Sequence, residues 1–245
     1  MEWGRAKTIL IIAFVVLNML LVFQLRDSTQ DMTVQNVDME SFSDEVRALM
    51  KSKNVVIESD MPEVSGPLEQ ITVTFDGGSL PVKKQTLNQP IASNVALNSS
   101  EFYAMLQTRV NDVEMSDYQY DEQMTNDRVI LYHQLYEGLP MFEVNLRLYR
   151  ENGKVVAYSR DRVTIETMGE QTMISSYTAV STLVENYLPD GAVVEHVQLG
   201  YHGQIYNSEK QFLTPFWRVL LADGSKYYVH AINGAVEALQ KESNS

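Results

Sequence analysis

PMFEVNLRLYRENGKVVAYS (Pro140–Ser159) is the stretch with the clearest structural signal in the chain. Over Phe142–Leu148, apolar and polar residues alternate, which is typical of a strand that buries one of its two faces. Asn152-Gly153 follows, and this pair favours the tight turn of a two-stranded hairpin. The sequence therefore predicts antiparallel strands at Met141–Arg150 and Lys154–Ser159.

A second segment matches the start of this hairpin. Pro140–Leu146 aligns with Pro215–Leu221, because each has an aromatic residue two places after the proline, a valine at four and a leucine at six. Asp223-Gly224 then supplies the second turn. Proline is tolerated at the start of a strand, where it needs no ladder hydrogen bond. We infer two related α+β lobes, each with a helix packed on an antiparallel sheet.

Three helices and several further strands complete the two lobes. Capping patterns at Ser41–Asp44 and Asn98–Glu101 precede helical stripes, and a third helix begins near Ser176 and stops before Pro189. The apolar stripes comprise Phe42, Val46, Leu49 and Met50; Phe102, Met105, Leu106 and Val110; and Val180, Leu183, Val184, Tyr187 and Leu188. Further strands are expected at Val55–Ile57, Ile71–Phe75, Val129–Tyr136, Val193–Tyr201, Phe216–Ala222 and Lys226–Ile232. Asn233-Gly234 makes another turn before a last segment at Ala235–Leu239. The lobes are assigned to residues 39–168 and 169–245.

The N-terminal part has a different character. TILIIAFVVLNMLLVFQL (Thr8–Leu25) contains no charge and has the length of a helix that crosses the hydrocarbon core of a bilayer. A cleaved signal peptide is the alternative, but its apolar region is shorter and a small-x-small site follows it. Here Gln24–Asp27 follows instead. We expect a cytoplasmic N-terminus at 1–7, a transmembrane helix at 8–25 and a linker at 26–38.

The charges on either side of this segment predict its orientation. Arg5 and Lys7 precede it, whereas Arg26 is followed by Asp27 and Asp31. More positive charge on the N-terminal side favours a cytoplasmic N-terminus. The expected location is the cell membrane, with a single pass and the C-terminal region outside the cytoplasm.

One polar residue lies near the middle of the expected membrane helix. The amide of Asn18 would lack hydrogen-bond partners among lipid tails, so it should face another helix; a bond within its own helix or a homodimer is the alternative. The predicted partner-binding face consists of Asn18 with Ile11, Phe14, Val15, Leu21, Val22 and Leu25.

Composition limits the possible functions. Hydrophobic residues make up 44% of the chain, which is enough for a buried core, and the net charge of −13 disfavours binding to nucleic acid. The chain has no cysteine, which excludes disulfides, thiol nucleophiles and iron–sulfur clusters.

No catalytic, cofactor-binding or metal-binding residue is predicted, and no cofactor. None of the histidines fits a zinc motif, so we expect surface or sheet-face positions for them (His133, His196, His202 and His230). An acidic cluster comprises Asp117, Asp121, Glu122 and Asp127. A calcium loop usually needs a glycine bend, which is missing here, so a solvated loop is expected. A carboxylate pair for glycoside hydrolysis stays open, although nothing singles out one pair.

Three segments resemble the YycI (WalI) family: MEWGRAKTI (Met1–Ile9), EGLPMF (Glu137–Phe142) and YYVHAINGAVE (Tyr227–Glu237). The resemblance implies a non-enzymatic, membrane-anchored regulator found with YycH beside the WalK–WalR (YycG–YycF) two-component system. It implies binding to YycH and the sensor histidine kinase WalK, substantially through transmembrane helices, and PepSY-like lobes. The sign of regulation stays open. The alternatives are an anchored binding module or chaperone for another envelope protein, and an envelope hydrolase.

Overall fold

The computed structural model describes residue 14 and residues 38–64, 66–76, 83–93, 95–110, 113–203 and 209–239. The chain divides into two compact units, Met1–Asp38 and Met39–Ser245. Of the expected partner-binding face, only Phe14 is described; it is helical and exposed, and Ile11, Val15, Asn18, Leu21, Val22 and Leu25 lie outside the described residues. Within the described ranges, no helix is both long and apolar enough to cross a bilayer.

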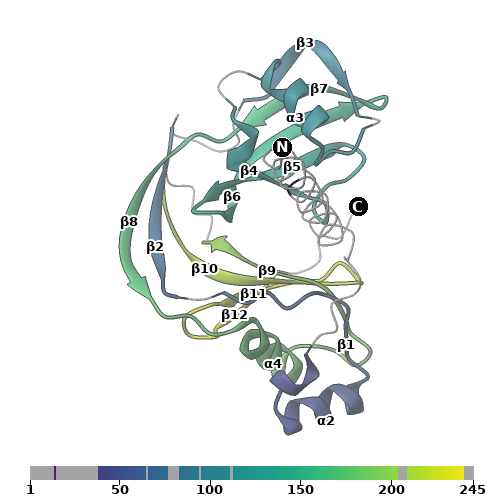
Figure 1. Cartoon of the computed structure of the whole chain (residues 1–245), viewed down its shortest axis with the longest axis vertical. Coiled ribbons are helices and arrows are strands. Elements are labelled where there is room, and N and C mark those ends of the chain that lie inside the picture. Colours follow the sequence, from purple (N-terminus) through teal and green to yellow (C-terminus); the bar gives the residue numbers. More distant parts are fainter. Residues whose placement is uncertain are drawn as a thin grey trace, which may run out of the picture. The chain divides into compact units, whose positions relative to one another are not determined.

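The second unit is a mixed α+β structure made mostly of sheet (Figure 1). Its described strands form one twelve-stranded sheet with the central order β12-β11-β10-β9-β6-β5-β4. The strands are β1 (Val56–Ile57), β2 (Leu68–Phe75), β3 (Gln85–Ala92), β4 (Tyr118–Asp121), β5 (Val129–Tyr136), β6 (Leu139–Glu151), β7 (Lys154–Arg160), β8 (Val163–Gln171), β9 (Val193–His202), β10 (Lys210–Leu221), β11 (Lys226–His230) and β12 (Val236–Leu239). β1 and β6 each pair with β9 in parallel, and the other pairs are antiparallel.

Both predicted hairpins are confirmed. β6 and β7 are joined at Asn152 and Gly153, whose φ values of 50° and 71° suit the Asn-Gly turn. β10 and β11 are joined through Gly224, with φ of 84°. The predicted position of Pro215 at a strand start is wrong, because β10 begins at Lys210. Pro215 lies where β10 leaves β2 and begins to pair with β9, and its carbonyl accepts from the Ala231 amide.

The prediction that β6 buries only one face holds for part of the strand. From Leu146 to Tyr149, buried and half-buried residues alternate, but Glu143 and Asn145 are only 8% and 5% exposed. The β5–β6 register passes from His133↔Asn145 to Gln134↔Met141, so residues 142–144 bulge away from β5. β6 therefore buries side chains on both faces at this point.

The three predicted helices are present, each capped by a serine. α2 (Asp44–Lys53), α3 (Ser100–Gln107) and α4 (Ser176–Asn186) have Ser43, Ser99 and Ser175 as N-caps, each accepting a backbone hydrogen bond. Short 3₁₀ turns, η1 (Met39–Ser41) and η2 (Met115–Asp117), precede α2 and β4. The predicted stripes are buried with few exceptions, of which Tyr187 is 45% exposed.

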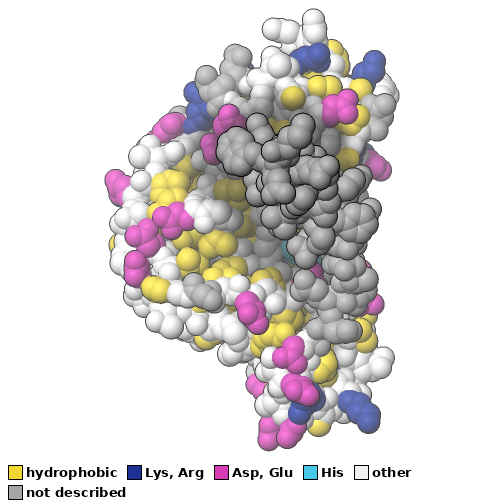
Figure 2. All heavy atoms as spheres, viewed as in Figure 1, with side chains coloured by type: hydrophobic (Ala, Val, Ile, Leu, Met, Phe, Trp, Pro, Cys, Tyr) yellow, Lys and Arg dark blue, Asp and Glu magenta, His cyan; other side chains and the backbone are white. Residues whose placement is uncertain are grey.

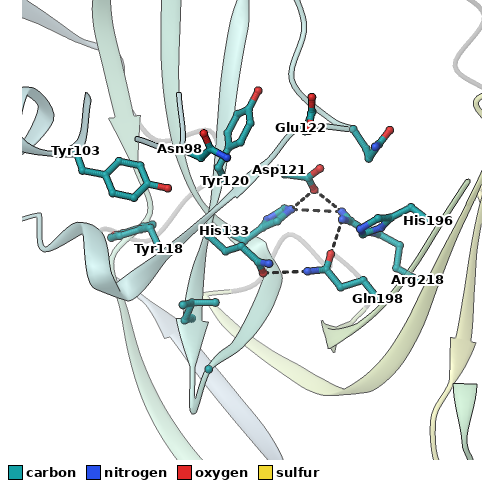
Figure 3. A pocket seen from close by; sticks show the side chains of 14 residues that line it. Asn98, Tyr103, Tyr118, Tyr120, Asp121, Glu122, His133, His196, Gln198 and Arg218 are labelled. Atoms are coloured by element: carbon teal, nitrogen blue, oxygen red, sulfur yellow. Dashed lines mark hydrogen bonds and ion pairs between the residues drawn. The ribbon is translucent and has the colours of Figure 1, made fainter. Parts of the chain in front are cut away.

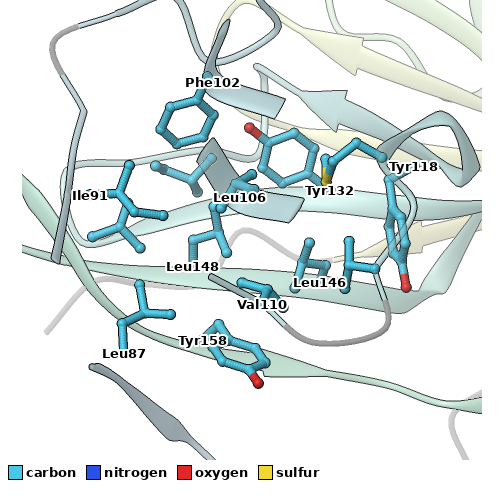
Figure 4. Close-up of a cluster of buried hydrophobic side chains, with 14 residues drawn as sticks. Leu87, Ile91, Phe102, Leu106, Val110, Tyr118, Tyr132, Leu146, Leu148 and Tyr158 are labelled. Atoms are coloured by element: carbon cyan, nitrogen blue, oxygen red, sulfur yellow. The ribbon is translucent and has the colours of Figure 1, made fainter. Parts of the chain in front are cut away.

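Helix α3 covers the sheet formed by β3, β5, β6 and β7. Phe102 and Leu106 of α3 are fully buried against Ile130, Leu146 and Leu148 (Figure 4). Helices α2 and α4 pack together elsewhere in this unit, and Phe42, which directly precedes the N-cap of α2, contacts Tyr177 of α4. Lys53 of α2 donates to the carbonyls of Val184 and Leu188 at the end of α4.

Three strands were not predicted from the sequence: β3, β4 and β8. β4 lies inside the segment that was expected to be a solvated acidic loop, and β8 pairs with β2 on the side opposite β10. The division of this unit into lobes at 39–168 and 169–245, and the relation between those lobes, stay predictions.

Candidate functional site

A polar cleft of about 520 Å³ lies where β4 and β5 approach β9 and β10 (Figure 3). This volume is within the range of small-molecule sites. The lining residues are Asn98, Tyr103, Tyr118, Gln119, Tyr120, Asp121, Glu122, Gln123, His133, Leu135, Gly138, His196, Gln198 and Arg218. Tyrosines and amides line most of the rim, and ionisable side chains meet at its base.

Three ionisable side chains from three strands form the base of the cleft. Asp121 ends β4, His133 lies in β5 and Arg218 in β10, and they are 5%, 3% and 2% exposed. Arg218 Nη1 donates to Asp121 Oδ2 at 2.5 Å, and His133 Nε2 lies 2.7 Å from the same oxygen. The carboxylate therefore bridges a cation from a strand distant in sequence to a histidine on the neighbouring strand.

The hydrogen bonds of His133 leave neither ring nitrogen free. Nδ1 lies 2.6 Å from Asn145 Oδ1, and the Asn145 amide nitrogen in turn donates to the Phe142 carbonyl. Both ring nitrogens therefore lie within hydrogen-bond distance of side-chain oxygens from neighbouring strands. Burial alone would raise the pKa of Asp121, but the hydrogen bond from His133 and the charge of Arg218 lower it well below its usual range.

Arg218 also makes contacts that bring β6 into this cluster. Its guanidinium carbon lies 4.4 Å from the ring centroid of Phe142, and Nη2 donates to Gln198 at 2.7 Å. The Phe142 ring lies against Gly200, where an added Cβ would come within 2.5 Å of it. Residues of the β6 bulge, β9 and β10 are thus fixed together around one arginine.

A second buried cluster lies around His202 at the end of β9. Nδ1 of His202 is 2.5 Å from Glu143 Oε1, and its ring stacks on Tyr228 with centroids 3.8 Å apart. Glu237 of β12 is 3.6 Å from Nε2. The second oxygen of Glu143 is buried without a hydrogen-bond partner. This cluster attaches the C-terminal strand to β6 and β9.

The ionisable side chains at the base of the cleft are bonded to one another and to side chains of neighbouring strands. Among the described residues, His133 has contacts with Asp121, Asn145 and Arg218, and none of these is a hydroxyl that it could activate. The described part of the chain also contains no group of three acidic or histidine side chains placed to hold a metal ion. The network can position strands and the polar rim above them.

The acidic segment differs from its predicted form at one residue. Asp117, Glu122 and Asp127 are exposed as expected, but Asp121 is buried, because it forms an ion pair with Arg218 and a hydrogen bond with His133. The four histidines lie on strands β5, β9 and β11, which confirms sheet positions for them. Arg218 was not singled out, although a charge between Trp217 and Val219 in an apolar strand is a usable signal.

Comparison with known proteins decides the family. The YycI family model, described as "YycI protein", matches residues 26–232. The chain belongs to the YycI family. Membership indicates a regulator of the WalK (YycG) two-component system, in a regulatory family that is not known for enzymatic activity.

Other comparisons add little to this membership. No curated protein matches the chain. A crystal structure of an uncharacterized protein from Eubacterium rectale ATCC 33656 is similar with a TM-score of 0.30 and 14% identity. The match covers 48% of this chain and 40% of that one, so this chain spans less than half the length of that protein.

Proposed function

We propose that this chain is a non-enzymatic, membrane-anchored regulator that binds a WalK-type sensor histidine kinase together with a YycH-like partner. The observation that carries the proposal is the YycI family match over residues 26–232. On this proposal the protein sits in the cell membrane with its N-terminus in the cytoplasm, and it changes kinase activity without chemistry of its own.

At the base of the cleft, His133 does not have the arrangement of a general base. His133, the histidine most deeply buried there, has both ring nitrogens engaged by Asn145 and Asp121. A general base needs a free nitrogen within reach of the proton it removes. The Asp121–Arg218 pair is likewise used to connect strands, so the cluster gives rigidity to a binding surface.

The proposed anchor is the uncharged segment at residues 8–25. It would place Asn18 near the middle of the bilayer, on a face with Ile11, Phe14, Val15, Leu21, Val22 and Leu25. A side-chain amide there gains about 0.6–2 kcal/mol from a hydrogen bond to another helix. We propose this face as the part that contacts the transmembrane helices of the kinase or the YycH-like protein, while two PepSY-like lobes, residues 39–168 and 169–245, lie outside the cytoplasm.

Co-purification of the full chain with the kinase and the YycH-like protein tests this proposal. Asn18→Leu should lower the recovered partner by about 3- to 30-fold, the range that corresponds to one such hydrogen bond. Val16→Leu, on the opposite face, is the matched control and should leave recovery unchanged.

Equal recovery with wild type and Asn18→Leu would remove Asn18 from the interface. Recovery of an unrelated envelope protein, with neither the kinase nor the YycH-like protein, would instead favour a binding module or chaperone.

A further inference from the structure

Strand β8 forms an open edge of the sheet. Over all of Val163–Gln171 it pairs with β2, and among the described strands it has no neighbour on its other side. In Figure 1 it runs along the outer margin of the molecule, outside β2. Thr164 and every residue from Glu166 to Gln171 are exposed. The backbone groups on this side are therefore unpaired within the described structure.

The alternation of hydrogen-bonded pairs along the β2–β8 ladder shows which backbone groups of β8 face the open side. Asp76 donates to the Arg162 carbonyl at 2.8 Å, and this pair continues the β2–β8 ladder. In an antiparallel ladder, hydrogen-bonded and non-hydrogen-bonded pairs alternate. The N–H and C=O groups of Thr164 and Glu166 thus point to β2, whereas those of Val163, Ile165 and Thr167 point outward. Phe75 donates to Glu209 on the opposite side, which fits the same alternation.

This edge lacks most of the features that prevent strand addition. Proteins protect open edges with lysine, proline, bulges or short strands. β8 contains neither lysine nor proline, and its register shift lies near one end, opposite Glu69 and Gln70. Val163, Ile165 and Thr167 therefore present a regular row of donors and acceptors.

The charge of this edge indicates what would bind there. Glu166 and Glu170 of β8 are exposed, and Figure 2 shows acidic side chains along this margin of the molecule beside a hydrophobic face. Glu166 also pairs with Lys210 of β10 at 2.9 Å, across β2 and therefore on the side away from the open edge. A basic strand would find complementary charge and open hydrogen-bonding groups in one place.

We propose that the free edge of β8 binds an extended, basic segment of a partner protein by strand addition. The inference deepens the proposed function, on which it rests for taking the partner to be an envelope protein. Ladder hydrogen bonds from Val163, Ile165 and Thr167 would hold the segment, and Glu166 and Glu170 would select its charge.

Photo-crosslinking in the native membrane tests this edge without assuming the partner's identity. A benzoylphenylalanine in place of Met168, which is 46% exposed, should form an adduct with a polypeptide whose crosslinked segment is basic and extended. Thr167→Pro removes an outward N–H and should lower adduct yield by about tenfold or more. Thr167→Ala should leave the yield unchanged.

Proline at position 166, next to Thr167, tests which backbone N–H groups of β8 point to β2 and which point outward. Glu166→Pro removes a hydrogen bond to β2 and should lower the melting temperature, whereas Thr167→Pro should leave it nearly unchanged. Similar destabilisation by both would overturn the assignment of outward groups.

Absence of an adduct, an adduct insensitive to Thr167→Pro, or an adduct with a second copy of this chain would each overturn the strand-addition proposal. Failure of the kinase and the YycH-like protein to co-purify with the wild-type chain would overturn the proposed function instead.

Discussion

At the scale of single residues, Gly200 is a position with too little room for a side chain. A Cβ there would lie 2.5 Å from the Phe142 ring and 2.6 Å from the Pro140 carbonyl oxygen. Gly200→Ala should therefore lower the free energy of unfolding by about 1–3 kcal/mol, as overpacked cores do. Urea denaturation measures this loss. Gly169→Ala, with no atom within 4 Å of its new Cβ, is the control and should change little.

Asp121 makes stability depend on pH at the acid end. Its pKa is lowered in the folded state, despite burial, by His133 and Arg218. Ionised Asp121 therefore makes its full contribution to the free energy of unfolding above the unfolded-state pKa of about 3.9. This contribution is lost progressively as the pH falls below that value. Asp121→Asn leaves Arg218 buried without its partner and should cost about 3–5 kcal/mol at neutral pH.

Chemical denaturation of wild type and Asp121→Asn between pH 7 and pH 2 checks both statements. The difference between the two proteins should shrink below pH ~4. A constant difference across that range would contradict the role given to the charge.

At the scale of elements, mutations at the start of α3 distinguish two candidate N-cap residues, Asn98 and Ser99. The Ser99 hydroxyl accepts from the Phe102 amide at 3.2 Å, whereas Asn98 is exposed and is not the N-cap. Ser99→Ala should lower the free energy of unfolding by about 1 kcal/mol, and Asn98→Ala should have almost no effect. Thermal denaturation distinguishes the two, and the opposite order would reassign the cap.

Elements with local signals were predictable, and those that depend on distant partners were not. The Asn152-Gly153 turn and the serine caps depend on a few adjacent residues, so the sequence is sufficient for them. The burial of Asp121 at the end of β4 depends on Arg218, 97 positions further along the chain. The residues next to Asp121 do not show whether its side chain is buried or solvated, because its partner Arg218 is distant in the sequence.

At the scale of the whole molecule, the fold should need neither disulfides nor metal. A fragment from about Asp31 to Ser245 should unfold cooperatively, with a melting temperature that EDTA and reductants do not change, since the chain has no cysteine. Calorimetry with and without each reagent measures this. A large fall with EDTA would reopen the Asp117–Asp127 segment as a calcium site.

Membrane topology gives a second test at this scale. Arg5 and Lys7 precede the uncharged segment, so a reporter active only outside the cytoplasm should work after Ser245 and fail before Met1. The reverse pattern would contradict export of the C-terminal region and the regulatory model with it.

The pairing of β2 with β10 has a consequence for biosynthesis. Ile71–Thr74 of β2 align with Lys210–Leu213 of β10, and β1 aligns with β9, so early strands depend on late ones. Translation proceeds at about 5–20 residues per second, so a nascent β2 waits on the order of ten seconds for its partner. A ribosome that stalls before β10 leaves the apolar Ile71 and Val73 uncovered on that side, as a substrate for chaperones and quality-control proteases.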